Sequence, residues 1–79
     1  MKLTVKLSTT LRDHVPGYAP EAGLQVEMPE GSTVAQLAQH LGLPLRDIKI
    51  VMVNGRQHQV DDPMRDGDRI AYFPAVGGG

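Results

Sequence analysis

The chain has 79 residues and a formal net charge of −1, with 41% hydrophobic and 22% charged residues. This length corresponds to one domain with a modest core, because so short a chain buries only about 60% of its unfolded surface. The sequence contains no cysteine, which excludes disulfides and cysteine-ligated metal clusters. Its eight basic residues are scattered, so we expect no nucleic-acid partner. It has no apolar run that predicts a membrane span.

The first third of the chain contains two segments that alternate between polar and apolar residues. Residues 3–7 alternate in this way, which predicts a strand with one buried face. This start lacks the apolar block of a signal peptide, so we expect a cytoplasmic protein. The Ser-Thr-Thr sequence at 8–10 offers N-caps for a short helical turn over 11–15, which Pro16 ends. Residues 24–28 alternate again and predict a second strand.

The clearest signal in the middle of the chain is that of a helix. Thr33 and Gln36 have the spacing of a capping box. Gly42 stands where a left-handed residue commonly ends a helix. The sequence therefore predicts the main helix over 34–41. Its apolar face would consist of Val34, Leu37, Ala38 and Leu41.

Three further strands are predicted in the second half. Residues 48–53 are apolar except for one lysine, which indicates a central or partner-facing strand. Asn54-Gly55 is a strong two-residue hairpin signal. Residues 56–60 would form the polar return strand at an edge. The last strand is expected over 69–73, with Pro74 stopping it.

This order of elements predicts an α+β fold of the ubiquitin-like β-grasp type. It would have a five-stranded mixed sheet with one main helix packed on one face, because a single amphipathic helix covers only one side of a sheet. The first and last strands would lie side by side, parallel, at the centre. We expect a β-grasp domain over residues 1–76 and a flexible glycine tail over 77–79.

Alternation in the last two long strands predicts which side chains the helix covers. The covered set would be Val51, Val53, Ile70 and Tyr72. The opposite parity leaves Ile50, Met52 and Phe73 on the uncovered face. Exposed apolar patches usually mark interfaces, so we predict that these three side chains bind a partner. The alternatives are that loops cover the patch or that the parity is reversed.

The polar residues do not form a recognisable catalytic or metal-binding pattern. His14, His40 and His58 lie on separate elements, without the spacing of metal ligands. The acidic residues of 61–68 lack the pattern of a calcium loop and suit turns. No serine, histidine and acid arrangement suggests a nucleophile. We therefore expect no metal, no bound cofactor and no enzymatic activity in the chain itself.

Three glycines, Gly77–Gly79, close the sequence. Glycines without Cβ atoms can be threaded through a narrow tunnel of a partner until the terminal carboxylate reaches a reactive centre. This reading makes the carboxylate of Gly79, or of Gly78 if the last residue is trimmed, the functional group. The alternative is a disordered end without a role.

Several segments, taken together and in order, resemble the sulfur-carrier branch of the ubiquitin-like superfamily. They are Met28–Val34, Val51–Gly55 and Asp66–Pro74, and the ending Phe73–Gly78 resembles the tail of the molybdopterin synthase small subunit. The thiamine-pathway sulfur carrier is similar but usually lacks the proline after the phenylalanine. The third glycine and the loop Pro16–Gly23 depart from the usual small subunit.

The resemblance implies a carrier cycle. An E1-like enzyme would use ATP to adenylate the C-terminal carboxylate, a sulfur donor would convert it to a thiocarboxylate, and an acceptor such as the molybdopterin synthase large subunit would use the sulfur. Catalytic residues would then lie on the partners. The implied contacts with them are Phe73, Pro74, Val76 and Gly77, together with Met52 and Ile50. The alternatives are a carrier for thiamine or another thio-metabolite, a ubiquitin-like modifier, and a plain interaction module.

Overall fold

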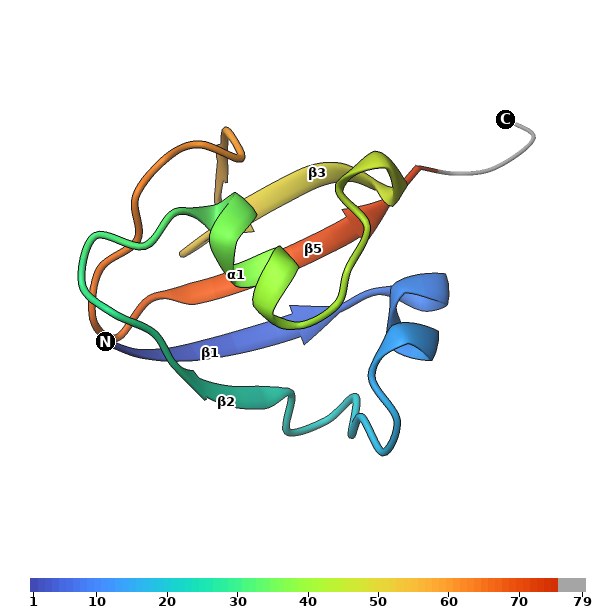
Figure 1. Ribbon diagram of the computed structural model, residues 1–79. Helices are drawn as coiled ribbons and strands as arrows, with labels where there is room; N and C mark the ends of the chain where they lie inside the picture. Colours follow the sequence, from blue (N-terminus) through green and yellow to red (C-terminus); the bar gives the residue numbers. More distant parts are fainter. Residues whose placement is uncertain (76–79) are drawn as a thin grey trace.

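Five strands form one mixed sheet in the order β2-β1-β5-β3-β4 in the computed structural model, which describes residues 1–75 (Figure 1). The strands are β1 (Lys2–Leu7), β2 (Leu24–Glu27), β3 (Ile48–Val53), β4 (Arg56–His58) and β5 (Arg69–Pro74). The helix α1 (Val34–His40) lies across one face, and two short 3-10 turns are η1 (Thr9–His14) and η2 (Leu45–Asp47). β1 and β5 are parallel neighbours at the centre, which confirms the predicted β-grasp topology. No helix within residues 1–75 is long and apolar enough to cross a membrane.

Local hydrogen bonds fix both ends of α1 as the sequence predicts. Gln36 N donates to Thr33 Oγ1 at 3.2 Å, and Thr33 N donates to Gln36 Oε1 at 2.8 Å, which completes the capping box. At the other end, Gly42 has a φ of +77°. Leu43 N then donates to Ala38 O at 2.9 Å, the closure expected of a glycine-ended helix. The helix begins and ends where its local signals place it, within one residue.

The turn at Gly42 after α1 brings a further leucine into the core. Leu41, which was predicted to lie on the apolar helix face, is half-buried and packs against the core. The reversal at Gly42 directs Leu43 back toward the sheet, where it is 3% exposed. The predicted apolar helix face therefore packs on the core along its whole length, with Leu41 at its border.

The strand β4 is two residues shorter than predicted and ends at His58. The next carbonyl groups are used by the start of α1, because Ala35 N donates to Val60 O at 2.6 Å and Val34 N donates to Asp62 O at 3.1 Å. The first N–H groups of a helix have no partner within the helix. The segment after β4 therefore turns away from the sheet to cap α1.

Two smaller predictions also need correction. The first helical turn is η1, which begins at Thr9 rather than residue 11. Ser8 stands at its N-cap without a side-chain hydrogen bond, because its backbone still continues the sheet through a Ser8 N to Tyr72 O bond of 3.2 Å. Pro74 does not stop β5 but is its last residue, paired with Ile48. Ala75 N donates to Asp47 O on the η2 side, so the nitrogen of Pro74 faces the opposite side of β5. The pairing with β1 has already ended there, and the strand therefore tolerates a residue without an N–H group.

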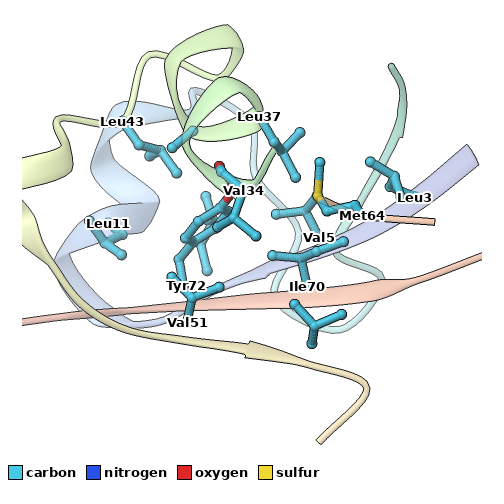
Figure 2. Packing of buried hydrophobic residues seen from close by; sticks show 13 residues of the cluster. Leu3, Val5, Leu11, Val34, Leu37, Leu43, Val51, Met64, Ile70 and Tyr72 are labelled. Atoms are coloured by element: carbon cyan, nitrogen blue, oxygen red, sulfur yellow. Dashed lines mark hydrogen bonds between the residues drawn. The ribbon is translucent and has the colours of Figure 1, made fainter. Parts of the chain in front are cut away.

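Tyr72 stands at the centre of the core between the sheet and α1 (Figure 2). Its hydroxyl donates to Val34 O at 2.7 Å and thus joins β5 to the helix. The buried side chains around it come from all the main elements except the edge strands. They are Leu3, Val5, Leu7, Leu11, Val34, Leu37, Ala38, Leu43, Val51, Val53, Met64 and Ile70.

Burial raises the pKa of Tyr72 well above its ordinary value, because the ionised phenolate would lose its hydration. The unfolded chain ionises this group near pH 10, whereas the folded chain does not. Above that pH the unfolded state binds fewer protons, so the free energy of unfolding should fall as the pH rises. Tyr72→Phe should reduce this alkaline loss, and at pH 7 it should cost about 1–2 kcal/mol through the missing hydrogen bond. Urea unfolding of the wild type and of Tyr72→Phe between neutral and alkaline pH measures both effects. If the free energy of unfolding falls equally with pH in the two proteins, the expected reduction of the alkaline loss is contradicted.

Candidate functional site

The sheet face opposite α1 carries a small group of apolar side chains. Cross-strand neighbours share one face, and the register pairs Ile50 with Phe73 and Met52 with Ala71. Ile50 and Phe73 are each 37% exposed, although both are large and apolar. We call these four residues the apolar face. The predicted parity is confirmed, since Val51, Val53, Ile70 and Tyr72 are all buried beneath the helix.

A β-bulge in β3 makes this arrangement possible. The pairing with β5 shifts register between Ile48 and Ile50. Strict alternation with Val51 would place Lys49 in the core, at a large desolvation cost. The extra residue instead lets Ile48 pack against the core while Lys49 and Ile50 are both exposed. Bulges commonly redirect a side chain in this way.

Phe73 forms a ridge between two shallow hollows. The hollow on one side is lined by residues that include Lys6, Met52 and Arg69. The hollow on the other side is lined by residues that include Ile50 and Ala75, where the chain leaves β5. An aromatic side chain raised between two depressions has the shape of an anchor for a complementary surface.

The stem of the tail is fixed at this end of the sheet. Ala75 N donates to the carbonyl oxygen of Asp47 at 3.1 Å, which holds the chain beside η2 after β5 ends. The predicted roles of Val76 and of Gly77–Gly79, and the domain boundary after residue 76, lie outside the described residues. The chain therefore leaves the sheet at Ala75, next to Ile50 and Phe73 of the apolar face.

Two of the three histidines each approach one acidic side chain. His14 Nε2 lies 3.8 Å from Asp47 Oδ2, and His58 Nδ1 lies 3.3 Å from Asp62 Oδ2. Among residues 1–75, no three histidine or acidic side chains gather in a group that could hold a metal ion. These pairs join neighbouring segments and do not point into either hollow.

Sequence reasoning missed three cations around the apolar face. Lys6 and Arg69 line the hollow that contains Met52, and Lys49 lines the other hollow. Parity alone would have placed Lys6 and Arg69 there. Unbroken alternation would bury Lys49, and because a buried lysine is unfavourable, this position could have indicated a bulge that exposes its side chain.

The fold and the exposed face together define a ubiquitin-like domain. A family model described as Mut7-C ubiquitin matches residues 1–77. The chain therefore belongs to the Mut7-C ubiquitin family, which confirms the predicted relation to the ubiquitin-like superfamily. No curated protein matches the sequence.

Solved structures agree with this assignment. The H. volcanii small archaeal modifier protein 1 has a TM-score of 0.74 at 20% identity, over 95% of this chain and 98% of the other. The HVO 2177 protein of Haloferax volcanii has a TM-score of 0.76 at 26% identity, over 100% and 87%. A chain from the complex of subunits 1 and 2 of the molybdopterin-converting factor of Helicobacter pylori has a TM-score of 0.61 at 18% identity, over 100% of both. At these identities the similarity establishes the fold.

Proposed function

We propose that this protein is a sulfur carrier whose glycine tail is activated at its carboxylate and converted to a thiocarboxylate. The observation that carries the proposal is a ubiquitin-like domain whose fixed stem leads from an exposed apolar face into three glycines. The sequence Phe73–Val76, which resembles the corresponding segment of the molybdopterin synthase small subunit, favours molybdopterin synthesis as the destination of the sulfur. The similarity to a chain of the molybdopterin-converting factor complex supports the same destination.

The chemistry needs two partner enzymes. In the first step a carboxylate oxygen of the last glycine attacks the α-phosphorus of ATP, and pyrophosphate leaves. The resulting acyl-adenylate has a good leaving group where the carboxylate had none. In the second step a hydrosulfide equivalent attacks the carbonyl carbon and expels AMP, which leaves the thiocarboxylate. An acceptor enzyme, such as a large subunit of molybdopterin synthase, then takes the sulfur.

The carrier contributes position rather than catalytic groups to this cycle. The apolar face, led by Phe73, would hold the domain on the partner while the tail enters the active site. Ala75, tied to Asp47 O, sets the point from which the tail starts. Glycine residues have no Cβ atom and therefore fit a narrow channel. We place the catalytic residues and the ATP site on the partners.

A second candidate function is conjugation to other proteins. The structural similarity to small archaeal modifier protein 1 favours it. A lysine amine would then attack the same acyl-adenylate, expel AMP and form an isopeptide bond. Both functions share the first step and differ in the nucleophile of the second.

The test is the intact mass of the protein after incubation with the E1-like adenylating enzyme of the same organism, ATP and sodium sulfide. We expect the replacement of one oxygen by sulfur at Gly79, or at Gly78 after trimming. Gly78→Val should abolish the change without unfolding the domain, because a β-branched side chain obstructs the channel. Ala22→Val is the control, because it adds the same branched group at an exposed loop position that has no positive φ. Isopeptide products alone would establish the modifier function, and an unmodified tail would contradict both.

A further inference from the structure

We infer that the apolar face docks on an acidic surface of the adenylating enzyme, where carboxylates surround an apolar hollow that receives Phe73. The inference rests on the proposed function and specifies the chemistry of its first partner. It comes from the distribution of charge over the sheet, which the overall net charge of −1 conceals.

Positive and negative side chains are segregated between strands and turns. The strands carry five of the eight lysines and arginines but only one of the nine aspartates and glutamates. The strand cations are Lys2, Lys6, Lys49, Arg56 and Arg69, and the strand acid is Glu27. The sheet is therefore cationic in a protein that is slightly acidic as a whole.

Most of this positive charge lies on the uncovered face. Lys6 is the cross-strand neighbour of Ala71, and Arg69 lies two residues before Ala71 on the same strand, so both flank the apolar face. The bulge adds Lys49 on the opposite side of Phe73. Arg56, in contrast, pairs with Val53 and belongs to the other face.

These cations are not neutralised within the described part of the chain. Residues 1–75 contain no ion pair between a carboxylate and a lysine or arginine, since both ion pairs involve histidines. Lys6 Nζ donates to the carbonyl oxygens of Pro20 and Glu21, which holds the ammonium group in place while its charge persists. Lys49 and Arg69 are exposed on either side of Phe73. They are the cations most available to a partner.

Three of the nine acidic side chains accept hydrogen bonds from backbone N–H groups in or beside turns. Asp62 accepts from Gln59 N at 2.9 Å, and Asp68 accepts from Arg65 N at 2.8 Å. Asp66 accepts from Lys2 N at 2.6 Å. These carboxylates stabilise the turns that lead into the sheet. Three carboxylates thus stabilise turns, and within residues 1–75 no carboxylate forms an ion pair with Lys49 or Arg69, which leaves these two cations for an interface.

The occupant that suits this face is a surface with carboxylates around an apolar hollow. A second copy of the chain would place the same cations opposite one another, which is unfavourable. The hollow beside Lys49 and Ile50 also includes Pro74 and Ala75. A partner that draws the tail into its active site must therefore pass over these residues, and the adenylating enzyme is the first to do so.

The test is steady-state adenylation by the cognate E1-like enzyme, with this protein as the varied substrate. The combined variant Lys49→Glu with Arg69→Glu should raise KM for the protein about tenfold or more with little change in kcat, because docking affects binding before chemistry. Arg56→Glu reverses one charge on the other sheet face and should leave KM unchanged, whereas Lys49→Glu or Arg69→Glu alone, which also reverse one charge, should each raise it. Raising the salt from about 0.05 M to about 0.5 M should raise KM of the wild type more than that of the combined variant.

Other outcomes separate the alternatives. Equal KM values for the combined variant and Arg56→Glu would overturn the inference. If Phe73→Glu weakens docking but the cation variants do not, the partner surface is apolar and not acidic. Cosedimentation with phosphatidylserine vesicles that depends on Lys49 and Arg69 would assign the face to a membrane instead. Absence of any wild-type adenylation would contradict the proposed function itself, and direct binding of the same variants to the enzyme without ATP would still decide the docking surface.

Discussion

Leu37→Ala is expected to lower the free energy of unfolding by about 2–5 kcal/mol, the range for truncating a buried leucine. The side chain is fully buried in the middle of α1 and points at the sheet (Figure 2). The loss combines the transfer free energy of the removed groups with the cavity that they leave. Within residues 1–75, α1 is the only α-helix, and Leu37 lies in the middle of its buried face.

The measurement is urea unfolding at neutral pH, followed by circular dichroism. Leu45→Ala is the matched control, because this leucine is 46% exposed on η2. We expect the control to lose less than about 1 kcal/mol. A similar loss in both variants would mean that α1 does not carry the core.

Gly23→Ala should destabilise the protein by about 2–4 kcal/mol, because two separate penalties act at this position. Gly23 has a φ of +72°, which costs any residue with a Cβ atom about 1–2 kcal/mol. An added Cβ atom would also lie 2.6 Å from the carbonyl oxygen of Val5 and 3.1 Å from Cδ of Lys6. The first neighbour is backbone of the central strand β1, so the entry to β2 would have to shift.

Gly17→Ala isolates the first of these penalties, the cost of the positive φ. Gly17 has a φ of +78°, and an added Cβ atom would meet nothing within 4 Å. This control should therefore show the backbone cost alone, about 1–2 kcal/mol. Equal losses for the two glycines in thermal or urea unfolding would show that the close approach to Val5 O has no energetic weight.

The parts of the fold that could be predicted depend on short-range signals. The Thr33–Gln36 capping box and Gly42 specify α1 through bonds that span only a few residues. Asn54-Gly55 specifies the β3–β4 hairpin, because both residues adopt the positive φ values that this turn needs. The alternation in β1 specifies which of its side chains are buried. Each of these features depends on residues that are close together in the sequence.

The parts that could not be predicted depend on competition between distant groups. β4 stops at His58 because the N–H groups at the start of α1 take the carbonyl oxygens of Val60 and Asp62. Met64, in the turn before β5, enters the core without any periodic pattern that marks it. For the candidate site, parity placed Ile50 and Phe73 correctly, but the bulge that exposes Lys49 requires knowledge of the pairing with β5.

The parallel pairing of β1 and β5 has a consequence for synthesis in the cell. β5 is the last strand in chain order, yet it lies between β1 and β3 at the centre of the sheet. A nascent chain on the ribosome cannot complete this sheet until Arg69–Pro74 has emerged. Until then β1, β2 and α1 lack β5, the strand against which β1 pairs and α1 packs. Pairing over so large a sequence separation is slow compared with the folding of helical domains. The sheet is therefore complete only after Arg69–Pro74 has been synthesised, and a partner that recognises the finished sheet would not bind chains that lack β5.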